Sequence, residues 1–131
     1  MTGVRGILDD LIKMRDVEAC LLEIHMPTGR KVISPEKVKL KNLALWGLIK
    51  RATGDLFSIS QELYVYGLDK MHFELKEHEI IMSFIGPRTA LIVVIPSLAN
   101  RGLIEVEIEN TKRMILEVMK HEEPDHDKTR K

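Results

Sequence analysis

The apolar residues of this chain follow two spacings, one typical of helices and one typical of strands. Residues 3–14 have a single apolar stripe and predict a short amphipathic helix. Residues 16–26, "DVEACLLEIHM", are apolar on both alternating sets of positions, as in a strand whose two faces are covered. The segment "PTGR" (27–30) predicts a turn, and "KVIS" (31–34) predicts a second strand in a hairpin with the first.

A longer helix is predicted from Glu36 to Val65, since no proline interrupts this segment. Ser34 suits the N-cap and Pro35 the first helical position. One apolar stripe is expected to cover the chain's own sheet: Val38, Leu45, Ile49, Ala52, Leu56, Ile59 and Leu63. A second face is expected to point away from that sheet: Leu40, Leu43, Trp46, Gly47, Gly54 and Phe57. Its two glycines are either tolerated surface positions or points where another helix approaches closely.

Three further strands are predicted in the second half of the chain. Residues 67–75 alternate apolar and polar side chains, which indicates one buried and one solvated face. Residues 79–85 and 90–95 follow after short turns, and the second of these is apolar throughout, as expected at the centre of a sheet. Pro96 ends that strand because proline has no N–H group to donate to a strand ladder. Because short turns join the three strands, we expect them to form a meander.

Residues 104–109, "IEVEIE", fit either a strand or a helix. Their apolar and acidic residues alternate with the period of a half-buried strand. The same residues also belong to an apolar helical stripe that continues to Val118. No glycine, proline or tight turn breaks residues 103–120, a length far above that of an ordinary strand. We therefore predict a helix, with Asn100 as its N-cap.

Composition narrows the class of protein. The 131 residues suit a single domain, with twenty basic and twenty acidic side chains and a formal net charge of zero. Without a basic surplus, nucleic acid is not expected as a partner. The highly charged segment 121–131 predicts a disordered tail after one domain of residues 1–120.

The single cysteine and the absence of long apolar stretches bear on location. Cys20 lies in the apolar run "ACLLEI", where it is expected to pack as a small hydrophobic side chain. One cysteine forms no internal disulfide, which suits a reducing compartment. No stretch resembles a signal peptide or a membrane span, so a cytoplasmic protein without membrane insertion is expected.

The sequence lacks the motifs of common catalytic and cofactor sites. It has no glycine-rich phosphate loop, so nucleotide binding by such a loop has no support. The histidines His25, His72 and His78 have no cysteine or histidine at ligand spacing, and no serine lies in a nucleophile elbow. We therefore predict no catalytic, cofactor-binding or metal-binding residue, and we expect that the chain is not an enzyme.

Residues 99–103, "ANRGL", followed by a predicted helix, resemble a signature of the roadblock/dynein light chain family of small longin-like domains. The hairpin "PTGRKVIS" also resembles the opening of that family, and the order of elements agrees over residues 3–120. The resemblance implies an α+β fold: a five-stranded antiparallel sheet with the long helix on one face and the two terminal helices on the other. Two features depart from the family, namely the bulky Trp46 in the long helix and "MP" before the hairpin turn.

The resemblance also implies a function. Roadblock-like proteins are similar in being homo- or heterodimeric platforms rather than enzymes, and prokaryotic members often pair with small Ras-like GTPases. We therefore expect a homodimeric adaptor or regulator of a small GTPase. The alternatives are a small-ligand sensor or enzyme with a pocket between sheet and helices, and a structural dimerisation module in a larger assembly.

The expected dimer interface combines the outer face of the long helix with the strand that follows it. The resemblance places that strand at an edge of the sheet, where pairing with a second copy would satisfy its free backbone groups. The expected interface residues are Leu40, Leu43, Trp46, Gly47, Gly54, Phe57, Met71 and Phe73.

Overall fold

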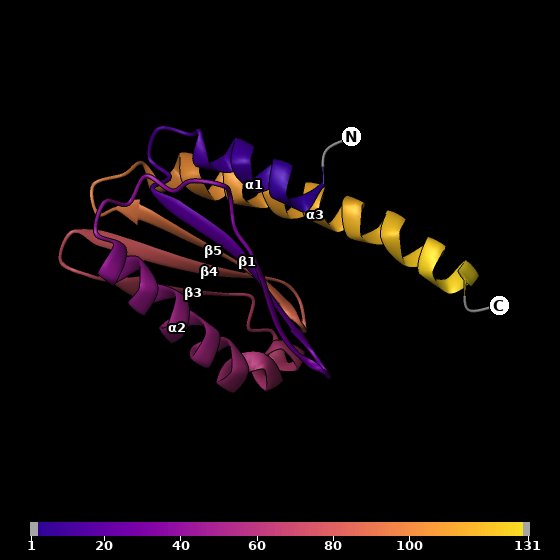
Figure 1. Cartoon of the computed structure of the whole chain (residues 1–131). Coiled ribbons are helices and arrows are strands. Elements are labelled where there is room, and N and C mark those ends of the chain that lie inside the picture. The colour runs from indigo at the N-terminus through magenta and orange to yellow at the C-terminus, as the bar shows by residue number, and fades with distance from the viewer. Residues whose placement is uncertain (1–2, 130–131) are drawn as a thin grey trace.

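The computed structural model describes the backbone of residues 3–129 and the side chains of residues 3–121. Its elements in chain order are α1 (Val4–Ile12), β1 (Ala19–Met26), β2 (Gly29–Ile33), α2 (Leu43–Ser60), the 3₁₀ helix η1 (Gln61–Tyr66), β3 (Lys70–Glu74), β4 (His78–Gly86), β5 (Thr89–Pro96) and α3 (Arg101–Thr129). This is the predicted order of helices and strands (Figure 1).

The five strands form one antiparallel sheet in the order β2-β1-β5-β4-β3. The strands β3, β4 and β5 are neighbours joined by short turns, so the predicted meander is confirmed. The central strand β5 is almost entirely buried, which accounts for its uniformly apolar sequence. The short strands β2 and β3 lie at the two edges.

Helices cover both faces of the sheet, as Figure 1 shows, with α1 and α3 on one face and α2 on the other. Alternate residues of β1 therefore belong to two cores: Cys20 and Leu22 pack beneath α1 and α3, whereas Ala19 and Leu21 pack beneath α2. The predicted α+β architecture is confirmed, including the strand that is covered on both faces.

The ambiguous residues 104–109 are helical, as predicted. The Asn100 side chain accepts a hydrogen bond from the backbone N–H of Leu103 at 3.1 Å, which is the predicted N-cap. Ile104 and Ile108 are buried against the sheet, and the alternating glutamates point elsewhere on the helix. Helix α3 is described as far as Thr129. The disordered tail stays a prediction, and residues 130–131 lie outside the described residues.

The predicted start of the long helix is wrong. Helix α2 begins at Leu43, with Asn42 as its N-cap, rather than after Ser34. The intervening residues pass over the end of the sheet, where the backbone N–H groups of Lys39 and Leu40 donate to the carbonyl oxygen of Glu18 at 2.8 and 3.0 Å. These N–H groups are used in a tertiary contact, so the segment does not form helical hydrogen bonds.

Candidate functional site

The face of α2 that packs on the sheet differs from the predicted one. Its buried positions are Trp46, Ile49, Thr53, Gly54, Phe57 and Ser60. The prediction that Leu40, Trp46 and Phe57 point away from the chain's own sheet is therefore wrong, because all three are buried within the core beneath α2.

Two buried hydroxyl groups explain the error. Thr53 and Ser60 interrupt the apolar pattern of this face, so a count of apolar residues alone favours the neighbouring stripe. Each hydroxyl is nevertheless satisfied within α2: Thr53 Oγ1 donates to the carbonyl oxygen of Ile49 at 2.7 Å, and Ser60 Oγ donates to that of Phe57 at 3.4 Å. A hydroxyl group that donates to a carbonyl oxygen of its own helix can be buried at little cost in free energy.

The two glycines of α2 have different surroundings. A Cβ atom at Gly54 would collide with the guanidinium group of Arg30, which reaches across from β2. The space at Gly54 is therefore filled by a side chain of the same chain, and its interpretation as a point of close approach by another helix is wrong. A Cβ atom at Gly47 would meet nothing within 4 Å.

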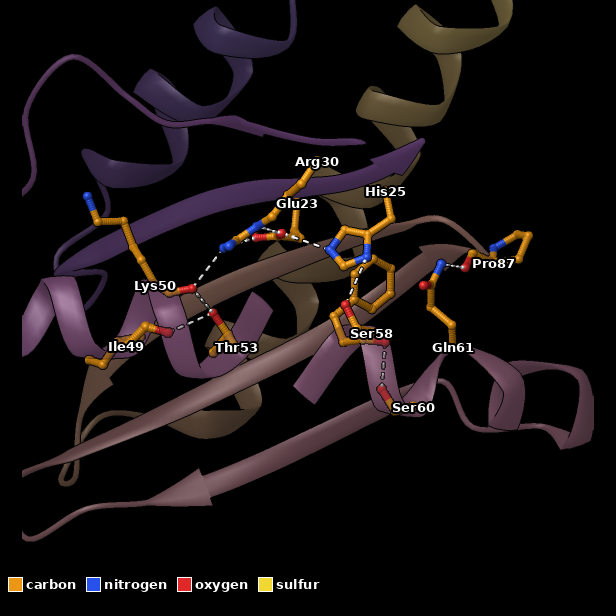
Figure 2. Close-up of polar contacts among 11 residues, drawn as sticks. Glu23, His25, Arg30, Ile49, Lys50, Thr53, Ser58, Ser60, Gln61 and Pro87 are labelled. Atoms are coloured by element: carbon orange, nitrogen blue, oxygen red, sulfur yellow. Dashed lines mark hydrogen bonds and ion pairs between the residues drawn. The ribbon is translucent and has the colours of Figure 1, made fainter. Parts of the chain in front are cut away.

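Arg30 belongs to a polar network that joins the β1–β2 hairpin to α2 (Figure 2). The Glu23 carboxylate has no exposed surface and accepts hydrogen bonds from Arg30 Nε and, at 3.1 Å, from Arg30 Nη2. Arg30 Nη2 also donates to the backbone carbonyl of Lys50 in α2 at 3.0 Å. A buried carboxylate is tolerated when it is paired and hydrogen-bonded, as Glu23 is here.

His25 extends this network toward the end of α2. Its Nε2 lies 2.9 Å from Glu23 Oε2, and its Nδ1 lies 3.3 Å from the hydroxyl of Ser58. The contacts that run from Ser58 through His25 to Glu23 follow the order of a Ser-His-carboxylate triad. The Glu23 carboxylate, however, is also paired with Arg30. Ser58 also lies within α2, where backbone N–H groups are engaged in helical bonds instead of being free for an oxyanion. This geometry favours a packing role for the network.

The outward stripe of α2 and the edge strand β3 enclose an apolar groove of about 330 Å³, which we call the α2–β3 groove. Its lining residues are Leu45, Leu48, Ile49, Ala52, Thr53, Leu56, Phe73, Leu75 and Ile80. Leu48 is 57% exposed and Leu75 is 40% exposed, although both are large apolar side chains. An exposed apolar groove beside an unpaired strand is a candidate surface for protein association.

The structure divides the predicted interface residues into three groups. Phe73 lines the α2–β3 groove, and Met71 packs beside it against the core under α2. Leu43 is 70% exposed at the start of α2 but does not line the groove. The remaining predicted residues are buried in the chain's own core or, at Gly47, face open space.

Among the side chains of residues 3–121, no group of three or more His, Cys, Asp or Glu is arranged to hold a metal ion. In the same part of the chain, no helix combines the length and the apolar character needed to cross a bilayer.

Solved structures of similar fold match most of the chain. Myxococcus xanthus MglB gives a TM-score of 0.68 at 16% sequence identity, and the match covers 90% of this chain and 95% of that chain. The Roadblock/LC7 domain from Streptomyces avermitilis gives 0.64 at 14% identity, with 90% and 98% covered. The chain has the Roadblock/LC7 fold. An MglB with a tetrameric arrangement gives 0.63 at 10% identity, with 90% and 88% covered.

At these identities the similarity establishes the fold, and the resemblance noted in the sequence is confirmed at that level. No protein-family model matches the sequence, and no curated protein matches it. Within this Roadblock/LC7 fold, the predicted interface contains only one lining residue of the α2–β3 groove, Phe73. The eight that it misses are Leu45, Leu48, Ile49, Ala52, Thr53, Leu56, Leu75 and Ile80. For four of them the available signal is the three-four spacing along α2, from which the sequence predicts an inner stripe: Leu45, Ile49, Ala52 and Leu56.

Proposed function

We propose that this chain is a non-catalytic adaptor that forms a homodimer through the α2–β3 groove and regulates a second protein. The observation that carries the proposal is the groove itself, an apolar surface next to a strand whose outer edge has no partner within the described chain. A second copy would cover the groove and pair the strand in a single step.

The energetics favour association of two copies. Full burial of a large apolar side chain contributes roughly 1.5 to 3 kcal/mol, and Leu48 and Leu75 are about half exposed in a single chain. A two-fold axis doubles this contribution and adds hydrogen bonds between the two edge strands. The sum is comparable with the roughly 4 to 15 kcal/mol that association costs in lost freedom of motion.

The regulated partner that we propose is a small Ras-like GTPase. This part rests on the family resemblance of residues 99–103 and of the hairpin, together with the fold shared with MglB. One MglB is described with a tetrameric arrangement, which supports self-association in that relative. Self-association and GTPase regulation are therefore proposals for the present chain.

Leu48→Glu tests the groove. We expect this variant to be a monomer near 15.0 kDa by light scattering at a concentration where the native chain is a dimer, because a carboxylate would be buried at the interface. Leu103→Glu is the matched control, since Leu103 is 52% exposed on α3 and lies outside the groove. A native monomer, or a dimeric Leu48→Glu variant, would contradict the proposed interface.

The partner is tested separately by pull-down of Ras-like GTPases loaded with GDP or a GTP analogue from the native cell. Retention that depends on the nucleotide supports the regulator. Stabilisation of the chain by a small metabolite in a thermal-shift screen, without any retained GTPase, would instead support the ligand-sensor alternative.

A further inference from the structure

The charged residues of this neutral chain are unevenly distributed. Residues 30–51 contain seven lysine and arginine residues and one acidic residue, Glu36, whereas the other 109 residues contain thirteen basic and nineteen acidic residues. The basic segment comprises most of β2, the loop that follows it and the first half of α2. A formal net charge of zero therefore conceals a positive region on one part of the molecule.

The loop between β2 and α2 exposes three lysines. In "KVKLK" (37–41), Val38 and Leu40 occupy alternate positions and pack into the core beneath α2. The lysines at the remaining positions are exposed: Lys37, Lys39 and Lys41. Lys39 Nζ donates to a backbone carbonyl oxygen just after α1 at 2.6 Å, which places it over the end of that helix.

The first half of α2 continues this positive region on the flank that faces β2. Leu43, Lys50 and Arg51 lie seven and eight residues apart, so they share one side of the helix. The Lys50 carbonyl oxygen accepts a hydrogen bond from Arg30 of β2 at 3.0 Å, which identifies that side. Leu43 is 70% exposed, although it follows directly after the loop lysines. This flank therefore combines exposed cations with an exposed apolar side chain.

We call five of these side chains the basic surface: Lys37, Lys39, Lys41, Lys50 and Arg51. None of them forms an ion pair with another side chain among residues 3–121. Lys50 Nζ instead lies 5.5 Å from the centre of the Trp46 ring. The positive charge of the basic surface is thus available to a partner outside the described chain.

The opposite face of the sheet has no such excess of charge. It is covered by α1 and α3 (Figure 1). Residues 3–16 contain three basic and three acidic residues, and residues 101–120 contain four of each. Screening limits an exposed charge to a range of about 10 Å at 0.1 M salt, so the local excess matters more than the net charge of the chain. An extended anionic partner would therefore attract the side of α2 that carries the basic surface.

The chemistry of the basic surface favours a lipid bilayer over nucleic acid. Four of its five cations are lysines, which act as point charges, whereas the guanidinium fork of arginine suits recognition of individual phosphates and bases. Exposed lysines beside an apolar side chain such as Leu43 are typical of segments that bind the headgroup region of anionic bilayers.

We propose that the basic surface docks the chain peripherally on a bilayer of anionic lipids, with Leu43 at the level of the headgroups. Each lysine or arginine close to such a bilayer raises the partition coefficient about fivefold. The docking is independent of the proposed homodimer, because the basic surface and the α2–β3 groove lie on opposite flanks of α2.

Co-sedimentation with vesicles tests the docking. We expect the native chain to bind phosphatidylcholine vesicles that contain about 30% phosphatidylglycerol at about 0.05 M salt, and to be released at about 0.5 M salt. Vesicles of phosphatidylcholine alone should leave it in solution. Lys37→Gln combined with Lys41→Gln should lower the partition coefficient about 25-fold, because two charges are removed. Absence of binding, or equal binding to both kinds of vesicle, would overturn the proposal.

Arg88→Gln combined with Lys120→Gln is the matched control. It removes the same charge from two exposed positions outside the basic surface, in the β4–β5 turn and in α3, and should change the partition coefficient less than about threefold. Equal losses in the two double variants would mean that total charge governs binding, against the proposal. A short DNA duplex that binds the native chain more tightly than the vesicles do, through Lys37 and Lys41, would assign the surface to nucleic acid instead.

A fluorescent label provides a second, geometric measurement. Leu43→Cys, labelled with an environment-sensitive thiol reagent, should show blue-shifted emission on binding the phosphatidylglycerol vesicles. Leu103→Cys is the control, since Leu103 is 52% exposed on α3 and should stay in water. The native Cys20 is buried and remains unlabelled. A shift at residue 103 without one at residue 43 would overturn the proposed orientation and the role of the basic surface.

Discussion

The carboxylate of Glu23 has no exposed surface, yet it lies near the centre of contacts among three elements. Arg30 of β2 neutralises it, Nε2 of His25 in β1 lies 2.9 Å from its Oε2, and Arg30 also donates to the Lys50 carbonyl of α2. Gly54, which has no side chain, leaves room for the guanidinium group. The pairing of Arg30 with Glu23 in the hairpin therefore depends on the space that Gly54 leaves in α2.

Gly54→Ala should destabilise the chain by about 1 to 3 kcal/mol. Helix propensity alone would favour alanine by about 1 kcal/mol, but the added Cβ displaces the guanidinium group of Arg30 and weakens its pairing with the buried Glu23 carboxylate. Because Arg30 is 40% exposed, we expect this to cost roughly 2 to 4 kcal/mol, less than the loss of a fully buried pair. Gly47→Ala is the control, with an expected gain of about 1 kcal/mol because its Cβ meets nothing within 4 Å. Urea unfolding at equal protomer concentration measures both, and effects of the same sign would contradict this role of Arg30.

Cys20 should make the stability of the chain depend on alkaline pH. Burial chiefly, with the charge of Asp9, raises the pKa of this thiol from 9.0 to about 12. A raised folded pKa means that the contribution of the neutral thiol is complete below pH 9.0 and is lost as pH rises toward 12. Each pH unit within that window should lower the free energy of unfolding by about 1.4 kcal/mol.

The measurement compares the native chain with Cys20→Ala at pH 8 and pH 10. Lysines and tyrosines titrate in both proteins and cancel in the difference between their unfolding free energies. That difference should shift by about 1.4 kcal/mol against the native chain at the higher pH. A difference that stays constant with pH would show that the thiol ionises as readily in the folded chain as in the unfolded one, and would contradict the raised pKa.

At the scale of elements, the sequence predicted strands and the C-terminal helix well because their signals are local. Pro96 and the N-cap Asn100 mark a strand end and a helix start within a few residues of each other. Local signals of this kind could not decide which of the two apolar stripes of α2 faces the sheet. Which stripe faces the sheet depends on the self-satisfied hydroxyl of Thr53 and on Arg30, which arrives from a distant strand.

The start of α2 provides a test of that tertiary influence. Asn42 Oδ1 accepts from the Leu45 N–H at 3.0 Å, so Asn42→Ala should lower the unfolding free energy by about 1 kcal/mol. Ser34→Ala, at the position that the sequence favoured as the N-cap, should change it by less than about 0.5 kcal/mol. Equal losses in chemical denaturation would indicate a helix start other than the one described.

At the scale of the whole molecule, the two edges of the sheet differ. The β3 edge lies beside the apolar α2–β3 groove, whereas β2 is five residues long and largely exposed. Arg30 and Lys31 lie in β2, and Pro35 follows it, features that discourage further strand pairing. Association through β3 would therefore leave two protected β2 edges at the ends of a continuous sheet, which favours a closed dimer over an open chain of copies.

The fold also bears on whether the chain itself binds a nucleotide. Phosphate sites in nucleotide-binding proteins use free N–H groups at a helix N-terminus after a glycine-rich loop. In this chain, the side chains of Asn42 and Asn100 already accept hydrogen bonds from N–H groups in the first turns of α2 and α3. We therefore expect no GTP binding by calorimetry up to about 1 mM nucleotide. A micromolar dissociation constant would contradict this expectation, whereas altered GTP turnover by a Ras-like GTPase on addition of the chain would locate the chemistry in that partner.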